Sequence, residues 1–168
     1  LRKADAASCV ADFEPYGYDE RQFCSPGFDL PVGRMTRSFN GKYPQYHTSA
    51  DDLSLVSQEK LAESIRVLAQ ALSVLDANRH VLNLSPKGEP RLGKRGLYGS
   101  VGGNAPSGFE HALLWVLSLA DGTQDLVAMA DRSGVNFHQV LAAATALETA
   151  GLLRDCEDSS PRNRENVS

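Results

Sequence analysis

A segment rich in glycine and proline divides this chain of 168 residues into two parts. It runs from Ser85 to Ser107 and reads SPKGEPRLGKRGLYGSVGGNAPS. Glycine and proline at this density disfavour a regular helix or strand and mark a connection between domains. The sequence therefore predicts four regions: a first domain over 1–84, a Gly/Pro-rich basic linker over 85–107, a helical domain over 108–155, and a disordered polar tail over 156–168.

This predicted linker is also the most basic part of the chain, because it contains Lys87, Arg91, Lys94 and Arg95. Two interpretations remain open: contact with a phosphate group or an acidic partner, and a solvated linker that docks on the neighbouring domain. The composition favours the docked linker. The glycine-rich run over 99–103 is followed by no Gly-Lys-Ser/Thr, which argues against a phosphate-binding loop.

The first domain contains one clear amphipathic helix, which the sequence predicts from Ser54 to Leu75. Five apolar residues follow one another at steps of four, three, four and three and share one face: Leu61, Ile65, Leu68, Leu72 and Leu75. We expect this face to pack on a sheet. Only two short strands are predicted before the helix, at 6–13 and 30–39, so further strands upstream of Leu1 are expected. The absence of an initial methionine fits a fragment of a longer protein.

The second domain is predicted to hold three helices, at 110–119, 125–132 and 136–149. The short turn before the third helix and the apolar residues after it resemble a winged helix-turn-helix. Six carboxylates face only two arginines between Phe109 and Asp155, and the third helix contains no lysine or arginine. A surface that binds duplex DNA gains most of its affinity from cations that meet phosphates. The domain is therefore predicted to bind a protein partner or a second copy, and no nucleic acid.

Composition narrows the remaining classes of protein. Hydrophobic residues make up 42% and charged residues 23% of the chain, and the net charge is −4. No apolar run has the length of a membrane span, and no signal peptide pattern is present, so no membrane contact is expected. Three widely spaced cysteines predict neither a disulfide framework nor a zinc–cysteine site. We expect a cytoplasmic location.

Two short segments carry the candidate site residues. The first is Tyr46-His47-Thr48-Ser49-Ala50-Asp51, in which a histidine stands between an aromatic ring and a hydroxyl-rich turn. A neutral imidazole can bind a metal while a nearby carboxylate holds its other ring nitrogen. The local sequence alone favours a surface histidine that bonds to its own turn. The second segment is Asp19-Glu20-Arg21, which fits a solvated charged turn and the lining of a site equally well.

Taken together, these segments resemble the distal half of the M28-type zinc aminopeptidases, in particular the bacterial aminopeptidase-like proteins of the DUF4910 type that carry a winged helix. The matching segments are Asp19-Glu20-Arg21-Gln22, Ser25-Pro26-Gly27-Phe28 with Leu30-Pro31-Val32, and Tyr46-His47-Thr48 with Asp51. One departure is Tyr18, which stands where the family has a serine before the aspartate. The resemblance extends more loosely over residues 90–98 and the helical C-terminal region.

The resemblance implies an α/β fold, a partial aminopeptidase-like α/β/α domain, followed by an all-α, winged-helix-like domain. It implies two zinc ions in the full-length protein, with His47 as the last metal ligand and Tyr46 as the catalytic residue that stabilises the tetrahedral intermediate. Asp51 is expected to support the turn of His47 without binding the metal. Substrate binding is expected at Asp19, Glu20 and Arg21.

The implied activity is that of a zinc-dependent aminopeptidase-like hydrolase that cleaves peptide or related amide bonds. The remaining ligands and the general base are expected upstream of Leu1, so this chain alone is expected to be inactive. The alternative is a non-catalytic regulatory or scaffolding protein, linked to surface-polysaccharide biosynthesis, that retains the fold only.

Overall fold

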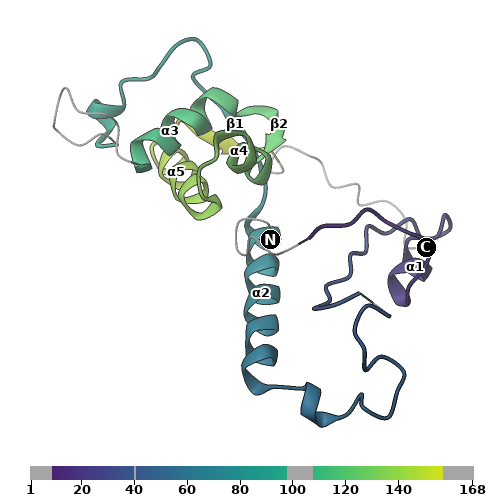
Figure 1. Cartoon of the computed structure of the whole chain (residues 1–168). Coiled ribbons are helices and arrows are strands. Elements are labelled where there is room, and N and C mark those ends of the chain that lie inside the picture. Colours follow the sequence, from purple (N-terminus) through teal and green to yellow (C-terminus); the bar gives the residue numbers. More distant parts are fainter. Residues whose placement is uncertain (1–8, 40, 98–107, 157–168) are drawn as a thin grey trace, which may run out of the picture. The chain divides into compact units, whose positions relative to one another are not determined.

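The computed structural model describes residues 9–39, 41–97 and 108–156. The chain divides into two compact units, Leu1–Ala69 and Gln70–Ser168, and the division falls within the long helix α2 (Gln58–Ala77). Both units are drawn in Figure 1. No helix in the described ranges is long and apolar enough to cross a bilayer. Residues 6–8, the glycine-rich run over 99–103 and the predicted tail from 157 onward lie outside the described residues.

The described residues of the first unit form mostly loops. The regular elements among them are α1 (Asp19–Phe23), the 3₁₀ turn η1 (Leu53–Leu55) and the N-terminal part of α2 (Figure 1). The strands predicted at 6–13 and 30–39 are wrong where the structure can be described, because residues 9–13 and 31–39 form no strand. Alternating apolar residues do not suffice for a strand, since its backbone groups need a neighbouring strand to pair with.

The predicted helix from Ser54 to Leu75 is present but begins later, because η1 precedes α2 (Gln58–Ala77). Ser57 lies just before it, and its Oγ accepts a hydrogen bond of 3.2 Å from the backbone N–H of Lys60. The five apolar residues of its predicted face are between 47% and 69% exposed. The described residues of the first unit contain no strand to cover this face, so the expected packing on a sheet that includes upstream strands stays a prediction.

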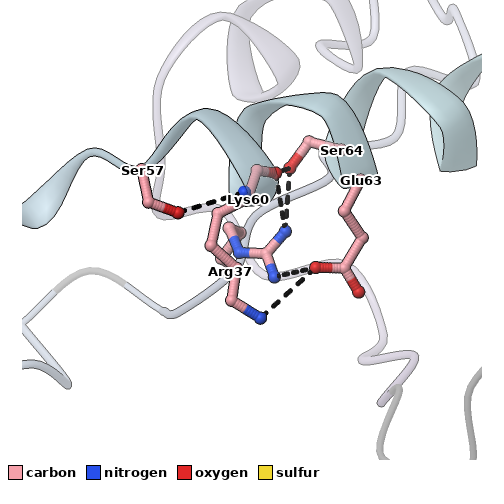
Figure 2. Close-up of polar contacts among 5 residues, drawn as sticks. All are labelled: Arg37, Ser57, Lys60, Glu63 and Ser64. Atoms are coloured by element: carbon pink, nitrogen blue, oxygen red, sulfur yellow. Dashed lines mark hydrogen bonds and ion pairs between the residues drawn. The ribbon is translucent and has the colours of Figure 1, made fainter.

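Arg37, which lies in the loop before η1, contacts three residues in the first turns of α2, as Figure 2 shows. Its Nη1 donates to the Lys60 carbonyl at 3.1 Å and to the Ser64 hydroxyl at 3.0 Å. Its Nη2 lies 2.6 Å from the Glu63 carboxylate. The hydrogen bond from Arg37 is the main reason that the pKa of Glu63 lies below its usual value. One planar guanidinium thus satisfies three acceptors on one helix.

The second unit combines a small antiparallel sheet with three helices. The sheet has the order β2-β1-β3, built from β1 (His80–Asn83), β2 (Asp121–Asp125) and β3 (Leu153–Asp155). Leu82 of the central strand is opposite Asp121 on one side and Arg154 on the other. The helices are α3 (Gly108–Leu119), α4 (Leu126–Ser133) and α5 (Phe137–Thr149). All three predicted helices are confirmed to within two residues of their observed ends.

Apolar side chains from these helices and from the sheet form the core of the second unit. The largest fully buried ones include Val81, Leu113, Leu126, Met129 and Leu147. Side-chain caps fix the starts of two helices, since the Asp125 carboxylate accepts from Ala128 N–H at 2.7 Å and the Asn136 side chain accepts from His138 N–H at 2.9 Å. The structure therefore supports a winged-helix-like unit of mixed helix and antiparallel sheet.

The described part of the predicted linker packs on this core. It contains the 3₁₀ helix η2 (Leu92–Arg95), and Leu92 is only 1% exposed. Leu97 packs against the same core. The residues before position 98 are thus anchored to the second unit, as the docked interpretation predicts.

Candidate functional site

Two segments of the first unit that lie far apart in the sequence meet at a pair of tyrosines. The hydroxyl oxygens of Tyr18 and Tyr46 are 3.3 Å apart and share a hydrogen bond. The Tyr46 ring stacks on the imidazole of His47, with centroids 4.0 Å apart and an angle of 13° between the planes. Tyr43 meets the Tyr46 ring edge-on, with centroids 5.5 Å apart. The predicted catalytic and metal-binding residues therefore form one stacked pair.

A tight turn presents the His47 side chain. Thr48 Oγ1 donates to the Gln45 carbonyl at 2.8 Å and accepts from Ala50 N–H at 3.2 Å. His47 itself has a φ of 58°, in the left-handed region that costs a residue other than glycine about 1–2 kcal/mol. Such strain persists only where the surrounding structure enforces it, and it is frequent at functional sites. The imidazole is held by its turn and by the Tyr46 ring.

The Tyr46 phenol is kept in its protonated form. The hydrogen bond with Tyr18 is the largest cause, and it raises the pKa of Tyr46 to about 12, with burial and the neighbouring phenols Tyr16 and Tyr43 adding to the effect. At neutral pH the phenol retains its proton and can donate a hydrogen bond. It can therefore stabilise negative charge that develops on a substrate oxygen.

The predicted supporting residue Asp51 closes the same turn. Its backbone N–H donates to the Thr48 carbonyl at 3.1 Å, and its carboxylate accepts from the Tyr43 hydroxyl at 3.5 Å. Partial burial, followed by the charge of Asp51, raises the pKa of Tyr43. Within the described structure the Asp51 carboxylate makes no hydrogen bond to the imidazole of His47. Its described contacts support the turn through Tyr43 and Thr48.

Of the three predicted substrate-binding residues, the structure connects only Glu20 to this cluster. Its carboxylate lies 3.1 Å from Arg34 Nη1 and accepts from Tyr18 N–H at 3.2 Å. The guanidinium carbon of Arg34 is 5.9 Å from the centre of the Tyr18 ring, within the range of a cation–π contact. Asp19 and Arg21 also belong to α1 but are exposed. Glu20 therefore lies beside Tyr18, the hydrogen-bond partner of Tyr46.

Sequence reasoning missed Tyr18 and Arg34. The only sequence signal for Tyr18 is its position, where the resemblance to the M28-type peptidases leads one to expect a serine. A tyrosine there brings a phenol to Tyr46, which a serine side chain is too short to do. No pattern in the sequence marks Arg34.

The described residues do not complete a zinc site. Structural and catalytic zinc ions bind three or four protein side chains. No group of three or more His, Cys, Asp or Glu side chains within residues 9–39, 41–97 and 108–156 is arranged to hold a metal ion. His47 can provide one nitrogen donor, and every further donor must come from elsewhere.

Comparison with protein families matches both parts of the chain. Residues 1–78 match a family model described as a domain of unknown function (DUF4910). Residues 79–155 match a family model described as a winged helix-turn-helix. The second match agrees with the sheet and the three helices of the second unit.

A curated protein and a solved structure, both from Clostridium acetobutylicum, are similar to most of the chain. One is named for polysaccharide biosynthesis and an aminopeptidase-like domain, and it is 46% identical over 146 residues, which are 86% of this chain and 33% of the relative. The other is a crystal structure described as that of a peptidase, with 41% identity and a TM-score of 0.75 over 89% of this chain and 33% of that chain. The chain thus spans about a third of the length of each relative. A peptidase-like fold is supported.

Proposed function

We propose that this chain is part of an aminopeptidase-like zinc hydrolase that cleaves peptide or related amide bonds. The observation that carries the proposal is the stacked pair of Tyr46 and His47, in which a strained turn presents an imidazole beside a phenol that keeps its proton. The similarity to an aminopeptidase-like protein and to a peptidase structure supports the class of reaction.

Each residue of the cluster has a distinct role in this proposal. His47 would provide one nitrogen donor to a zinc centre, and the resemblance to the M28-type peptidases implies two ions there. Tyr46 donates a hydrogen bond to the oxygen that gains charge in the tetrahedral intermediate. Tyr18 positions the Tyr46 hydroxyl, and Asp51 supports the turn that carries His47.

Tyr46→Phe in the longer protein tests this role. Removing one oxyanion donor typically lowers kcat by about 10²–10³-fold. We expect a loss of that size in the hydrolysis of aminoacyl p-nitroanilides, with little change in KM. Tyr16→Phe is the control, because Tyr16 is exposed and affects Tyr46 only through a weaker electrostatic contribution. Full activity of Tyr46→Phe, or equal losses in both variants, would contradict the role.

A second candidate function is a non-catalytic scaffold that keeps the fold only. It is favoured by one observation, that the described residues do not complete a metal site. Because one relative is named for polysaccharide biosynthesis, we propose that such a scaffold would act in that process. In either function we propose a cytoplasmic protein whose winged-helix unit binds a protein partner or a second copy, without nucleic acid or membrane.

A further inference from the structure

A cavity of about 480 Å³ lies in the loop that follows β1, within the second unit. Its volume falls in the range of sites for small molecules, which is about 300–1,000 Å³. Its lining includes four cationic side chains and one carboxylate: Lys87, Arg91, Lys94, Arg95 and Glu89. None of these lining residues belongs to the tyrosine–histidine cluster or to the helices of the winged-helix unit.

The loop is attached to the core before the cavity begins. The backbone N–H of Leu84 donates to the Leu152 carbonyl at 2.9 Å, next to β3. The N–H of Ser85 then donates to the Asn83 side-chain oxygen at 2.8 Å. These two hydrogen bonds fix the start of the loop that lines the cavity.

The loop is attached again after the cavity. Leu92 is fully buried in the core, and Leu97 N–H donates to the Leu92 carbonyl at 3.1 Å. Arg95 Nη1 donates to the Ala150 carbonyl, near the end of α5, at 2.8 Å. These contacts hold η2 against the second unit, so the cationic side chains belong to an anchored loop.

The cavity keeps a net positive charge, because its lining holds one carboxylate against four cationic side chains. Arg34, Arg37 and Arg79 each lie within 3.1 Å of a carboxylate oxygen. None of the four cationic side chains in the cavity forms an ion pair with a carboxylate in the described parts of the chain. The contact of Arg95 is to a carbonyl, which leaves its full charge available to an anion.

We propose that this cavity binds a small phosphorylated molecule through its phosphate groups. Arginine presents a planar fork that matches phosphate oxygens, and lysine adds a compact charge. A polymeric anion fits less well, because the neighbouring segment from Phe109 to Asp155 carries six carboxylates against two arginines. Those carboxylates repel the long backbone of a nucleic acid but not a ligand confined to the cavity. This site is independent of the function proposed above.

Isothermal titration of the full 168-residue chain with inorganic pyrophosphate, inorganic phosphate and ADP tests the proposal. We expect saturable binding that is tighter for pyrophosphate than for phosphate and that weakens as salt is raised from about 50 to 200 mM, because exposed charges are screened. Equal affinity for ADP and pyrophosphate supports recognition of the phosphates alone. Absence of saturable binding of pyrophosphate, binding of ADP alone, or tighter binding of duplex DNA would overturn the proposal.

Arg91→Gln and Lys94→Gln should each weaken pyrophosphate binding by about tenfold, since each removes a charge-assisted contact. Lys42→Gln is the control, because Lys42 is an exposed lysine of the first unit and lies outside the cavity. Arg95 is left unchanged because it also anchors the loop. Circular dichroism and melting temperature confirm that each variant is folded. Wild-type affinity in the Arg91 and Lys94 variants, or the same loss in Lys42→Gln, would contradict the site.

Discussion

The hydrogen bond with Tyr18 is the main cause that raises the pKa of Tyr46 to about 12. Tyr18→Phe should therefore lower the pKa of Tyr46 toward the usual value of 10.0. The pKa is raised in the folded state, so the stabilisation that accompanies it is complete below about pH 10 and is lost as the pH rises through about 12. A pH titration followed by the absorbance of ionised tyrosine, in the wild type and in Tyr18→Phe, measures this change in the pKa of Tyr46.

Tyr16→Phe is the control for this titration, because Tyr16 acts on Tyr46 only through a weaker electrostatic contribution. It should move the pKa of Tyr46 less than Tyr18→Phe does. If the two variants gave the same titration curve, the hydroxyl contact between Tyr18 and Tyr46 would not be the cause.

The left-handed backbone of His47 gives a second prediction at this scale. Asparagine tolerates this conformation, whereas a β-branched residue is a severe outlier in it. His47→Val should therefore be less stable than His47→Asn by about 1–2 kcal/mol, although both lose the ring that stacks on Tyr46. Urea unfolding of the two variants measures the difference. Equal stabilities would show that the turn does not hold residue 47 at a positive φ.

The residues of the cluster were only partly predictable from the sequence. Tyr46 and His47 are neighbours in one motif, so a resemblance between short segments finds both. Tyr18 reaches Tyr46 across 28 positions, and such a contact depends on the path of the chain between them. For the same reason the sequence could not separate Glu20, which pairs with Arg34, from its exposed neighbours Asp19 and Arg21.

At the scale of elements, the contact between Arg37 and α2 is open to a direct test (Figure 2). Arg37→Gln should raise the pKa of Glu63 toward its usual value of 4.5, because the guanidinium is the main cause of the lowered pKa. The stabilisation from this pair is present above pH 4.5 and is lost as the pH falls through the lowered pKa. Carboxyl NMR titration of Glu63 measures the change.

Arg66→Gln is the matched control, since Arg66 lies on the same helix and does not contact Glu63 in the described structure. It should leave the titration of Glu63 unchanged. Amide exchange at residues 60–64 should become faster in Arg37→Gln and not in Arg66→Gln. A Glu63 pKa that stayed low without Arg37 would contradict the contact.

Helices were predicted more reliably than strands for a physical reason. The apolar period of α3, α4 and α5 is set within each segment, and the same residues form the core. The strand β2 reads DGTQD, which has no apolar alternation, and it is a strand only because its backbone pairs with β1. The spacing of the apolar residues correctly predicted the apolar face of α2. It contains no information about which part of the protein covers that face.

The excess of carboxylates over arginines disfavours binding of nucleic acid by the winged-helix unit. Its third helix, α5, contains no lysine or arginine, and the segment from Phe109 to Asp155 is strongly acidic. The chain should therefore give no mobility shift with duplex DNA at physiological salt. A shift at sub-micromolar protein that weakens with added salt would contradict this prediction.

We propose that His47 binds zinc together with donors from the rest of a longer protein. The most direct measurement is the zinc content of that protein, after dialysis against a weak chelator, for the wild type, His47→Ala and His138→Ala. His138 is the control because it belongs to α5, in the other unit. We predict that the wild type and His138→Ala hold equal zinc and that His47→Ala loses at least one ion per chain while keeping its melting temperature. Full zinc in His47→Ala would contradict the claim.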